Sequence, residues 1–182
     1  RVLTNNCIKK NKKEVKIKRK NTKIVIGFAA PMYWSCKGLG IIEILYRELT
    51  KQGKKFELHI AGDGPQAIKL KKRLSQISKN QFKWHGWVNN IDIFFQKIDL
   101  LIIPSLYDSS PNLLFEAIEQ DKIVLASKIN AHNEILGYDE LLFSNKDIND
   151  LIDRIEKISF SKIYRTKIEK KISKIKKKFS FD

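Results

Sequence analysis

The stretch that decides the fold runs over residues 100–116 and reads Leu100-Leu-Ile-Ile-Pro-Ser-Leu-Tyr-Asp-Ser-Ser-Pro-Asn-Leu-Leu-Phe-Glu116. Its apolar start ends at a proline and a polar loop follows. Pro111 then stands where the first residue of a helix is expected, with Ser109 and Ser110 placed to cap that helix. The pattern predicts a buried strand, a loop and a helix start. A helix N-terminus at the end of a strand presents N–H groups and partial positive charge, which suit a phosphate.

Two carboxylates frame this helix start. Asp108 lies in the loop, and Glu116 lies just over one turn into the predicted helix. Carboxylates accept hydrogen bonds from hydroxyl groups, so a phosphate site with flanking acids suits a molecule that carries phosphates and sugar hydroxyls together. The local pattern therefore favours a sugar-nucleotide site over a bare phosphate site.

The rest of the chain alternates short apolar runs with amphipathic segments. The apolar runs predict strands at 24–28, 56–60, 82–85, 98–103, 123–126 and 141–143, and helical spacing predicts helices at 38–50, 66–78, 91–97, 111–120 and 147–158. This alternation predicts an α/β fold with a doubly wound, Rossmann-like parallel sheet. Ligands of such sheets bind at the carboxyl ends of the strands, so the loops that follow the strands are the candidate site.

The chain divides into three segments by composition. Residues 1–22 are expected to form a basic linker between domains, with a nucleic-acid or lipid arm as the alternative. Residues 23–160 are expected to form the nucleotide-sugar-binding domain. Residues 161–182 predict a Lys-rich helix, whose apolar face either packs against the sheet or contacts anionic lipid. The residues spaced for that face are Ile163, Ile168, Ile172 and Ile175.

The formal net charge of +16 in 182 residues favours acidic partners, namely nucleotide phosphates, anionic lipid or nucleic acid. A genome biased towards Lys, Ile and Asn would also raise the charge. Cys7 and Cys36 give neither a disulfide framework nor the spacing of a metal site. These cysteines favour a reducing compartment, and no group of carboxylates and histidines has the spacing of a metal site, so no metal is expected. The sequence shows no signal peptide or membrane span, and we expect a cytoplasmic protein.

The segment Asp108-x7-Glu116 resembles the acidic E-x7-E motif of retaining GT-B glycosyltransferases of family 4, the glycosyl transferases group 1. The resemblance spans residues 1–182 and implies the C-terminal, donor-binding half of a GT-B fold, with the N-terminal domain absent from this chain. It implies transfer of a hexosyl group from a UDP- or GDP-sugar, without a cofactor, to a saccharide or lipid-linked acceptor in surface polysaccharide or glycolipid synthesis. The protein would act in the cytoplasm or peripherally on the inner face of the membrane, and nucleic acid is not an expected partner.

The resemblance also implies roles for single residues. Asp108 would bind the donor sugar, Glu116 would accept from both ribose hydroxyls, and Lys37 would bind the diphosphate. Trp87 or Val88 would contact the base. The other implied donor-binding positions are Gly38, Gly62, Gly64, Ser109, Ser110 and the helix-start amides of Asn112, Leu113 and Leu114. Read without the resemblance, Gly62 and Gly64 predict a tight turn, Lys37 a surface residue and Trp87 a rim aromatic.

The chain departs from the family pattern in four places. No Arg lies between Gly27 and Lys37, where the family has one, and Asp108 is shorter than the family Glu by about 1.5 Å. Ser109 replaces a glycine, and Ile129-Asn130 replaces a glycine pair before Asn133-Glu134-Ile135, the counterpart of the family's Pro-Glu-Ile.

These departures and the net charge leave two alternatives open. The first is a non-catalytic GT-B module that binds nucleotide without turnover. The second, suggested by the charge, is a basic nucleic-acid or membrane-binding domain, whose binding would collapse with added salt. Structural roles are expected for His59 and His85, and His132 is a candidate substrate contact because it lies nearest the proposed site.

Overall fold

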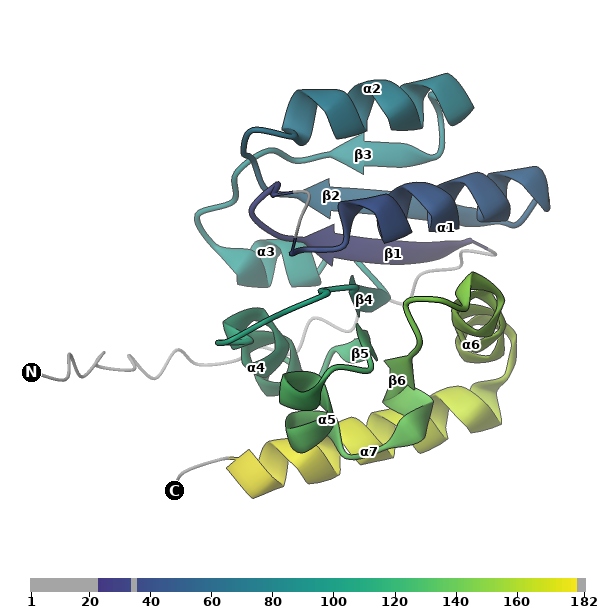
Figure 1. The fold of residues 1–182 in the computed structure, drawn as a ribbon. Helices are drawn as coiled ribbons and strands as arrows, with labels where there is room; N and C mark the ends of the chain where they lie inside the picture. Colours follow the sequence, from purple (N-terminus) through teal and green to yellow (C-terminus); the bar gives the residue numbers. More distant parts are fainter. Residues whose placement is uncertain (1–22, 34–35, 180–182) are drawn as a thin grey trace, which may run out of the picture.

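The computed structural model describes residues 23–33 and 36–179. Six parallel strands form one sheet in the order β3-β2-β1-β4-β5-β6 (Figure 1). The strands are β1 (Ile24–Ala29), β2 (Phe56–Ala61), β3 (Phe82–Trp84), β4 (Leu100–Ile103), β5 (Ile123–Ser127) and β6 (Leu142–Phe143). The prediction of a Rossmann-like parallel sheet is confirmed, and every strand lies within one or two residues of its expected position.

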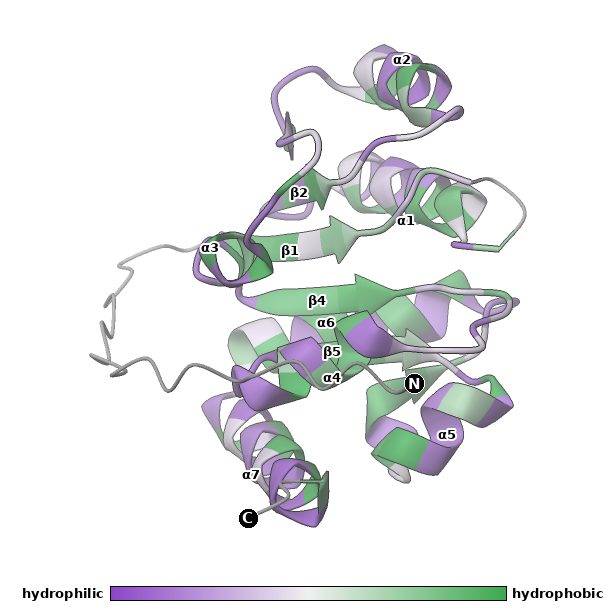
Figure 2. Ribbon diagram, turned by 90° about the vertical axis from the view of Figure 1, so that its left-hand side faces the viewer, coloured by the Kyte–Doolittle hydropathy of each residue, from purple (hydrophilic) through white to green (hydrophobic). Residues whose placement is uncertain are grey.

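Helices cover both faces of the sheet, with α1 and α2 on one side of the strands and α3 and α4 on the other (Figure 2). The helices are α1 (Leu39–Lys51), α2 (Ala67–Ile77), α3 (Ile91–Phe95), α4 (Asn112–Glu119), α5 (Asn130–Leu136), α6 (Ile148–Phe160) and α7 (Lys162–Phe179), with a 3-10 turn η1 (Asp139–Leu141). Because both faces are covered, the central strands are apolar along their whole length. All four residues of β4 are buried, and Leu100 is in register with Ile26 of β1 and Ile123 of β5.

Helix α5 is absent from the elements that the sequence predicts. Its seven residues bury His132, Ile135 and Leu136, and it ends at Gly137 with a φ of 61°. Seven residues make fewer than two turns, which is too short for a helical period to be recognised in the sequence. The buried residue His132 is polar, so it also interrupts the apolar pattern. The structure therefore adds a helix directly after β5.

The Lys-rich tail forms α7, which packs on α4, α5, α6 and β5. The side chains of Ile168, Ile172 and Ile175 on this helix are buried, so the expected packing against the body of the domain is found. The expected place of Ile163 on the same face is wrong, because this side chain is 87% exposed. Helical geometry gives the reason, since Ile163 lies five residues before Ile168 and therefore faces nearly the opposite way.

The expected linker at 1–22 lies outside the residues that the structure describes. Within the described helices, none combines the length and the apolar character that crossing a bilayer requires.

Candidate functional site

The loops after β1 and β4 touch at the carboxyl edge of the sheet. Gly38, the residue before α1, has a φ of 68°, and a Cβ atom there would lie 1.9 Å from the carbonyl oxygen of Pro104. The N–H of Leu106 also donates to the carbonyl oxygen of Cys36 at 2.8 Å. Glycine alone fits both the left-handed backbone and the close approach. Gly38 therefore serves to bring the two loops together.

An ion pair joins the same two loops. The Nζ atom of Lys37 lies 3.1 Å from Oδ2 of Asp108, and the two side chains are 25% and 10% exposed. The hydroxyl of Ser105 donates to Oδ2 at 3.4 Å, and the N–H of Ser110 donates to Oδ1 at 3.3 Å. The structure thus brings together the predicted phosphate-binding cation and the first predicted acid, and it holds the acid from three sides.

A small cavity of about 60 Å³ opens beside this ion pair. Pockets that enclose a small-molecule ligand have volumes of about 300–1,000 Å³, so this cavity is too small to enclose a nucleotide. A sugar nucleotide would have to lie over its mouth, with the cavity as part of the floor. Of the sequence-predicted residues, Lys37, Asp108, Leu113 and Leu114 line it, and Glu116 and Trp87 do not.

Helix α4 begins differently from the prediction. Pro111 holds the capping position, with φ −78° and ψ 56°, and no side chain caps the helix. The expected capping by Ser109 or Ser110 is therefore wrong, because the proline stands one residue earlier in the helix than expected. Its carbonyl accepts from Leu114 and Phe115, and the hydroxyl of Ser110 contacts Oδ1 of Asn112 at 3.2 Å.

Two of the predicted phosphate donors already have backbone partners. The N–H of Asn112 donates to Ser110 at 2.8 Å, and the N–H of Leu114 donates to Pro111 at 2.9 Å. A phosphate would have to share these N–H groups with the turn. Donation from Asn112, Leu113 and Leu114 to a diphosphate stays a prediction, as do contacts from Ser109 and Ser110.

Glu116 lies one turn into α4 and is close enough to Asp92 of α3 for the two carboxylates to interact. Burial raises the pKa of the Glu116 carboxyl, and the negative charges of Asp92 and Glu119 raise it further. Asp92 also accepts from the side-chain amide of Gln120 at 3.0 Å, which ties α3 to α4. Sequence reasoning missed Asp92, whose only local signal is a place in the first turn after the capping residue Asn90.

The glycines after β2 also permit close packing of loops. Gly62 has a φ of 126°, and a Cβ atom there would lie 1.9 Å from the carbonyl oxygen of Ala30. Gly64 has a φ of 146° and lies against the backbone of Met32, whose N–H donates to Asp63 at 2.9 Å. The tight turn predicted at Gly62 and Gly64 is present, and a donor contact there stays a prediction.

The aromatic turn after β3 stands apart from the cavity. Trp87 is 68% exposed, and Val88 packs partly against the core. An indole so exposed can stack on a flat base without any change in the core, and base contact by Trp87 or Val88 stays a prediction.

A buried polar network lies behind the Asp108 loop. Ser127 donates its hydroxyl to the carbonyl of Ser105 at 2.5 Å, and Nδ1 of His132 donates to the carbonyl of Ser127 at 2.9 Å. The side-chain amide of Asn145 reaches the same Ser105 carbonyl at 3.4 Å. Ser105 in turn holds Asp108, so the network supports the loop from inside the domain. Sequence reasoning missed Ser105, Ser127 and Asn145.

His132 is fully buried and does not line the cavity, so the structure places it beneath the site. Desolvation lowers its pKa, against the smaller raising effects of its backbone hydrogen bond and of Asp108. With Nδ1 donating, Nε2 carries the lone pair of a neutral ring. This Nε2 and Oδ1 of Asn145 are the two buried side-chain atoms in the described residues that lack a hydrogen-bond partner.

His59 and His85 have the structural roles expected of them. Nε2 of His59 lies 3.0 Å from Glu57, and Nε2 of His85 lies 3.3 Å from Nδ1 of His59. Burial opposes ionisation of Glu57, but Lys83, Lys23 and His59 outweigh it and lower the pKa of Glu57 to about 2. Among the residues described, no three His, Cys, Asp or Glu side chains gather as a metal site would need.

Comparison with known proteins places most of the chain in one family. The family model described as glycosyl transferases group 1 matches residues 23–159. Protein CapJ of Staphylococcus aureus is 27% identical over 146 residues, which are 79% of this chain and 37% of CapJ. The chain therefore spans well under half the length of this relative.

Solved structures resemble the fold at low sequence identity. The catalytic domain of cholesterol-alpha-glucosyltransferase from Helicobacter pylori aligns with a TM-score of 0.74 and 16% identity, over 86% of this chain and 99% of that one. A variant of TarM from S. aureus, solved with fondaparinux, alpha-GlcNAc-glycerol and UDP, aligns with a TM-score of 0.79 and 19% identity, over 90% of this chain and 34% of that one.

Proposed function

Because this chain belongs to the glycosyl transferases group 1 family and has the fold of a GT-B C-terminal domain, we propose that it binds the nucleotide-sugar donor of a retaining hexosyltransferase. The observation that carries the proposal is the pairing of Lys37 with Asp108 at the carboxyl edge of the sheet, at the start of α4. This edge is where doubly wound sheets bind their ligands. A cation for phosphates and a carboxylate for hydroxyls meet there.

The residues divide the donor between them. Lys37 neutralises the diphosphate, Asp108 accepts from a hydroxyl of the hexose, and Glu116 accepts from the ribose hydroxyls. As the bond between the sugar and the diphosphate breaks, the diphosphate takes the electron pair, and positive charge develops on the sugar. Fixed positive charge at Lys37 stabilises the leaving group, which is the electrostatic work that speeds such a reaction. The acceptor hydroxyl attacks on the face that the diphosphate leaves and gives its proton to the departing diphosphate, so the configuration is retained.

UDP is the favoured nucleotide and GDP the alternative, because the TarM variant was solved with UDP. The acceptor is proposed to be a saccharide or a lipid-linked saccharide of a surface polysaccharide or glycolipid, made in the cytoplasm. Since the chain spans 37% of CapJ, acceptor binding and full turnover are assigned to the whole protein. Donor binding can be tested on the chain itself.

The test is calorimetric titration of the chain with UDP, GDP and ADP at physiological salt, beside Glu116→Ala and Lys37→Ala. Glu119→Ala is the matched control, because it removes a carboxylate from the same helix one turn away. We expect one nucleotide to bind selectively, both site variants to weaken it tenfold or more, and the control to bind as the parent does. A folded chain that binds none of the three, or binds all three equally in every variant, would refute the donor site.

A non-catalytic nucleotide-binding module is the second candidate. It is favoured by the mutual neutralisation of Lys37 and Asp108 and by the missing Arg in the loop before Lys37. An activity assay of the whole protein distinguishes the two candidates. Release of UDP from a UDP-hexose in the presence of acceptor supports the enzyme, whereas tight binding of UDP without any release supports the module.

A further inference from the structure

The excess positive charge of this protein is concentrated in two short segments, residues 1–22 and helix α7. Helix α7 carries nine Lys or Arg residues against one Glu, a net charge of +8. Residues 23–161, which hold the sheet and the other helices, carry 18 Lys or Arg residues against 17 Asp or Glu residues, a net charge of +1. A general compositional bias would have charged the body of the domain as well. The charge on α7 is therefore a local feature of that helix.

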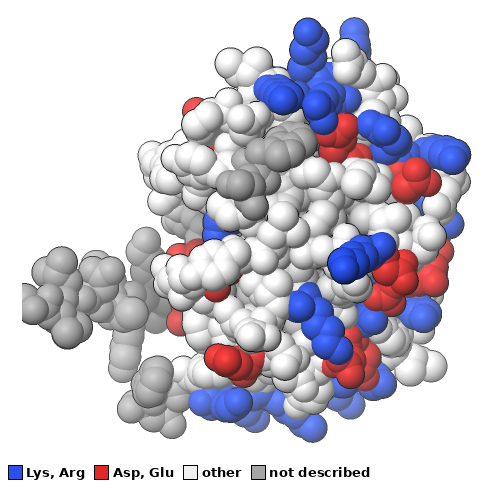
Figure 3. All heavy atoms as spheres, in the orientation of Figure 1, with Lys and Arg blue, Asp and Glu red and all other residues white. Residues whose placement is uncertain are grey.

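The charge on α7 is directed outward. Its buried residues Ile168, Ile172 and Ile175 face the domain, and Lys170, Lys174 and Lys177 repeat at the i, i+4 and i+7 spacing on the opposite side. Figure 3 shows Lys and Arg side chains along the lower edge of the molecule, where α7 runs in Figure 1. At 1.5 Å per residue, the 18 residues of α7 extend for about 27 Å. The result is a straight basic stripe along one edge of the domain.

Seven of the eight lysines of α7 fall into two groups, and the eighth, Lys178, lies over the ring of Phe179. Those on its flanks have partners, since Lys167 and Lys171 pair with Glu140, and Lys176 pairs with Asp121. The outward group makes no ion pair with any residue in the described part of the chain. We call this group the basic stripe, and it consists of Lys162, Lys170, Lys174 and Lys177.

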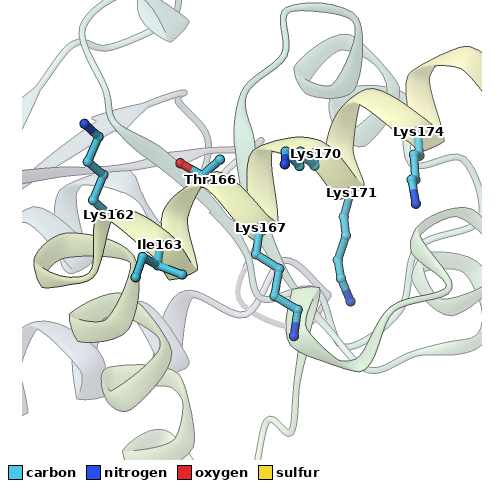
Figure 4. Close-up of a pocket in the computed structure, with 7 residues that line it drawn as sticks. All are labelled: Lys162, Ile163, Thr166, Lys167, Lys170, Lys171 and Lys174. Carbon is cyan, nitrogen blue, oxygen red and sulfur yellow. The ribbon is translucent and has the colours of Figure 1, made fainter.

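Apolar side chains accompany the basic stripe at one end. Ile163 is 87% exposed, and Phe160, the last residue of α6, is 75% exposed. Figure 4 shows Ile163 beside Lys162 and Lys167 on the open surface along α7. Exposure of these two large apolar side chains to water at the junction of α6 and α7 is unfavourable. Their burial against a partner would therefore be favourable.

We propose that the basic stripe of α7, with Ile163 and Phe160, docks this domain on an anionic lipid bilayer. A flat anionic surface can meet all four stripe lysines at once, and each Lys near such a surface contributes attraction. The two apolar side chains can enter the boundary between headgroups and acyl chains, as in helices that lie in the membrane interface. Nucleic acid would satisfy the lysines but would leave an exposed isoleucine without a function. The stripe shares no residue with the proposed donor site. The proposal of lipid docking and the proposal of donor binding can therefore be refuted independently.

The test is cosedimentation of the full chain with vesicles, at about 0.15 M salt. One set of vesicles is phosphatidylcholine alone, and the other contains phosphatidylcholine and phosphatidylglycerol in equal parts. The test variant is Lys170→Glu, Lys174→Glu and Lys177→Glu together. Its matched control is Lys71→Glu, Lys72→Glu and Lys79→Glu, an equal change of charge on exposed lysines in and just after α2. A third variant, Phe160→Ser with Ile163→Ser, changes no charge.

We expect the parent chain to bind the anionic vesicles and not the neutral ones. Binding should fall at least tenfold in the α7 variant and severalfold in the serine variant, and the α2 control should bind within twofold of the parent. Equal loss in the α2 control, or undiminished binding by the α7 variant, would refute the docking surface. If the serine variant binds vesicles as the parent does and the chain binds single-stranded RNA through the same lysines, the stripe is a nucleic-acid surface instead. Helical circular dichroism of each variant confirms that it is folded.

Discussion

The ammonium of Lys37 and the carboxylate of Asp108 lie 3.1 Å apart, although 71 positions separate the two residues in the chain. One comes from the loop after β1 and the other from the loop after β4, and the close approach of Gly38 to Pro104 brings these loops together. A diphosphate that binds Lys37 must therefore share its ammonium with Asp108. In the proposed donor site, the carboxylate would therefore oppose binding of the phosphates and favour binding of the sugar.

We therefore predict opposite effects of Asp108→Asn on two ligands. The affinity for UDP should rise about fivefold, because the variant removes a negative charge beside the phosphates and frees Lys37, a change worth roughly 1 kcal/mol for a partly exposed pair. The preference for a UDP-hexose over UDP should fall, because the amide accepts less well from a sugar hydroxyl. Calorimetry with both ligands measures the two effects. In a Lys37→Met background the gain for UDP should shrink, and a gain of the same size there would contradict the competition.

Gly38→Ala should destabilise the domain far more than Gly53→Ala. Both glycines have a positive φ, 68° and 64°, so alanine at either position costs roughly 1 kcal/mol of backbone strain. A Cβ atom at Gly38 would also lie 1.9 Å from a backbone oxygen, whereas nothing lies within 4 Å at Gly53. Urea unfolding should give a loss for Gly38→Ala at least twice that for Gly53→Ala. Equal losses would mean that the loops after β1 and β4 can move apart without loss of stability.

Much of the fold follows from local pattern. Every strand and most helices are predictable because buried strands such as β4 are uninterrupted apolar runs, and α1 repeats its apolar residues at helical spacing. That Lys37 and Asp108 lie at the same edge of the sheet is predictable because each follows a predicted strand, and parallel strands present their carboxyl ends at one edge. Their direct contact follows from topology once β1 and β4 are neighbours.

The support of the site is not predictable in this way. Ser105 meets Ser127 across 22 positions and Asn145 across 40, and no local spacing signals either contact. His132 lies on the short helix α5, where a buried histidine interrupts the only apolar pattern. The start of α4 was mispredicted for a related reason, because Pro111 fits the capping position and the first helical position equally well by sequence.

Acid should loosen the attachment of α7 through Glu140. Ion-paired hydrogen bonds from Lys171 and Lys167 lower the pKa of this carboxyl from 4.5 to about 2. Between those two values the unfolded chain binds more protons than the folded one, so the stabilisation is complete above about pH 4.5 and is lost as the pH falls towards 2. Glu140→Gln should make the fall in stability over this window shallower, measured by urea unfolding at several pH values, and the part due to Glu57 should remain. Glu134→Gln, an exposed glutamate on α5, is the control and should follow the parent curve.

Ser127→Ala should weaken the site as well as the fold. The hydroxyl of Ser127 donates to the carbonyl of Ser105, which immediately precedes the loop that holds Asp108. Its loss leaves a buried carbonyl with only the long contact from Asn145, which costs about 1–3 kcal/mol. Ser159→Ala is the matched control, because that hydroxyl bonds only to a carbonyl within its own helix. We expect a lower unfolding midpoint and weaker UDP-hexose binding for Ser127→Ala and little change for the control. Lower stability with unchanged donor affinity would show that the network supports the core and not the Asp108 loop.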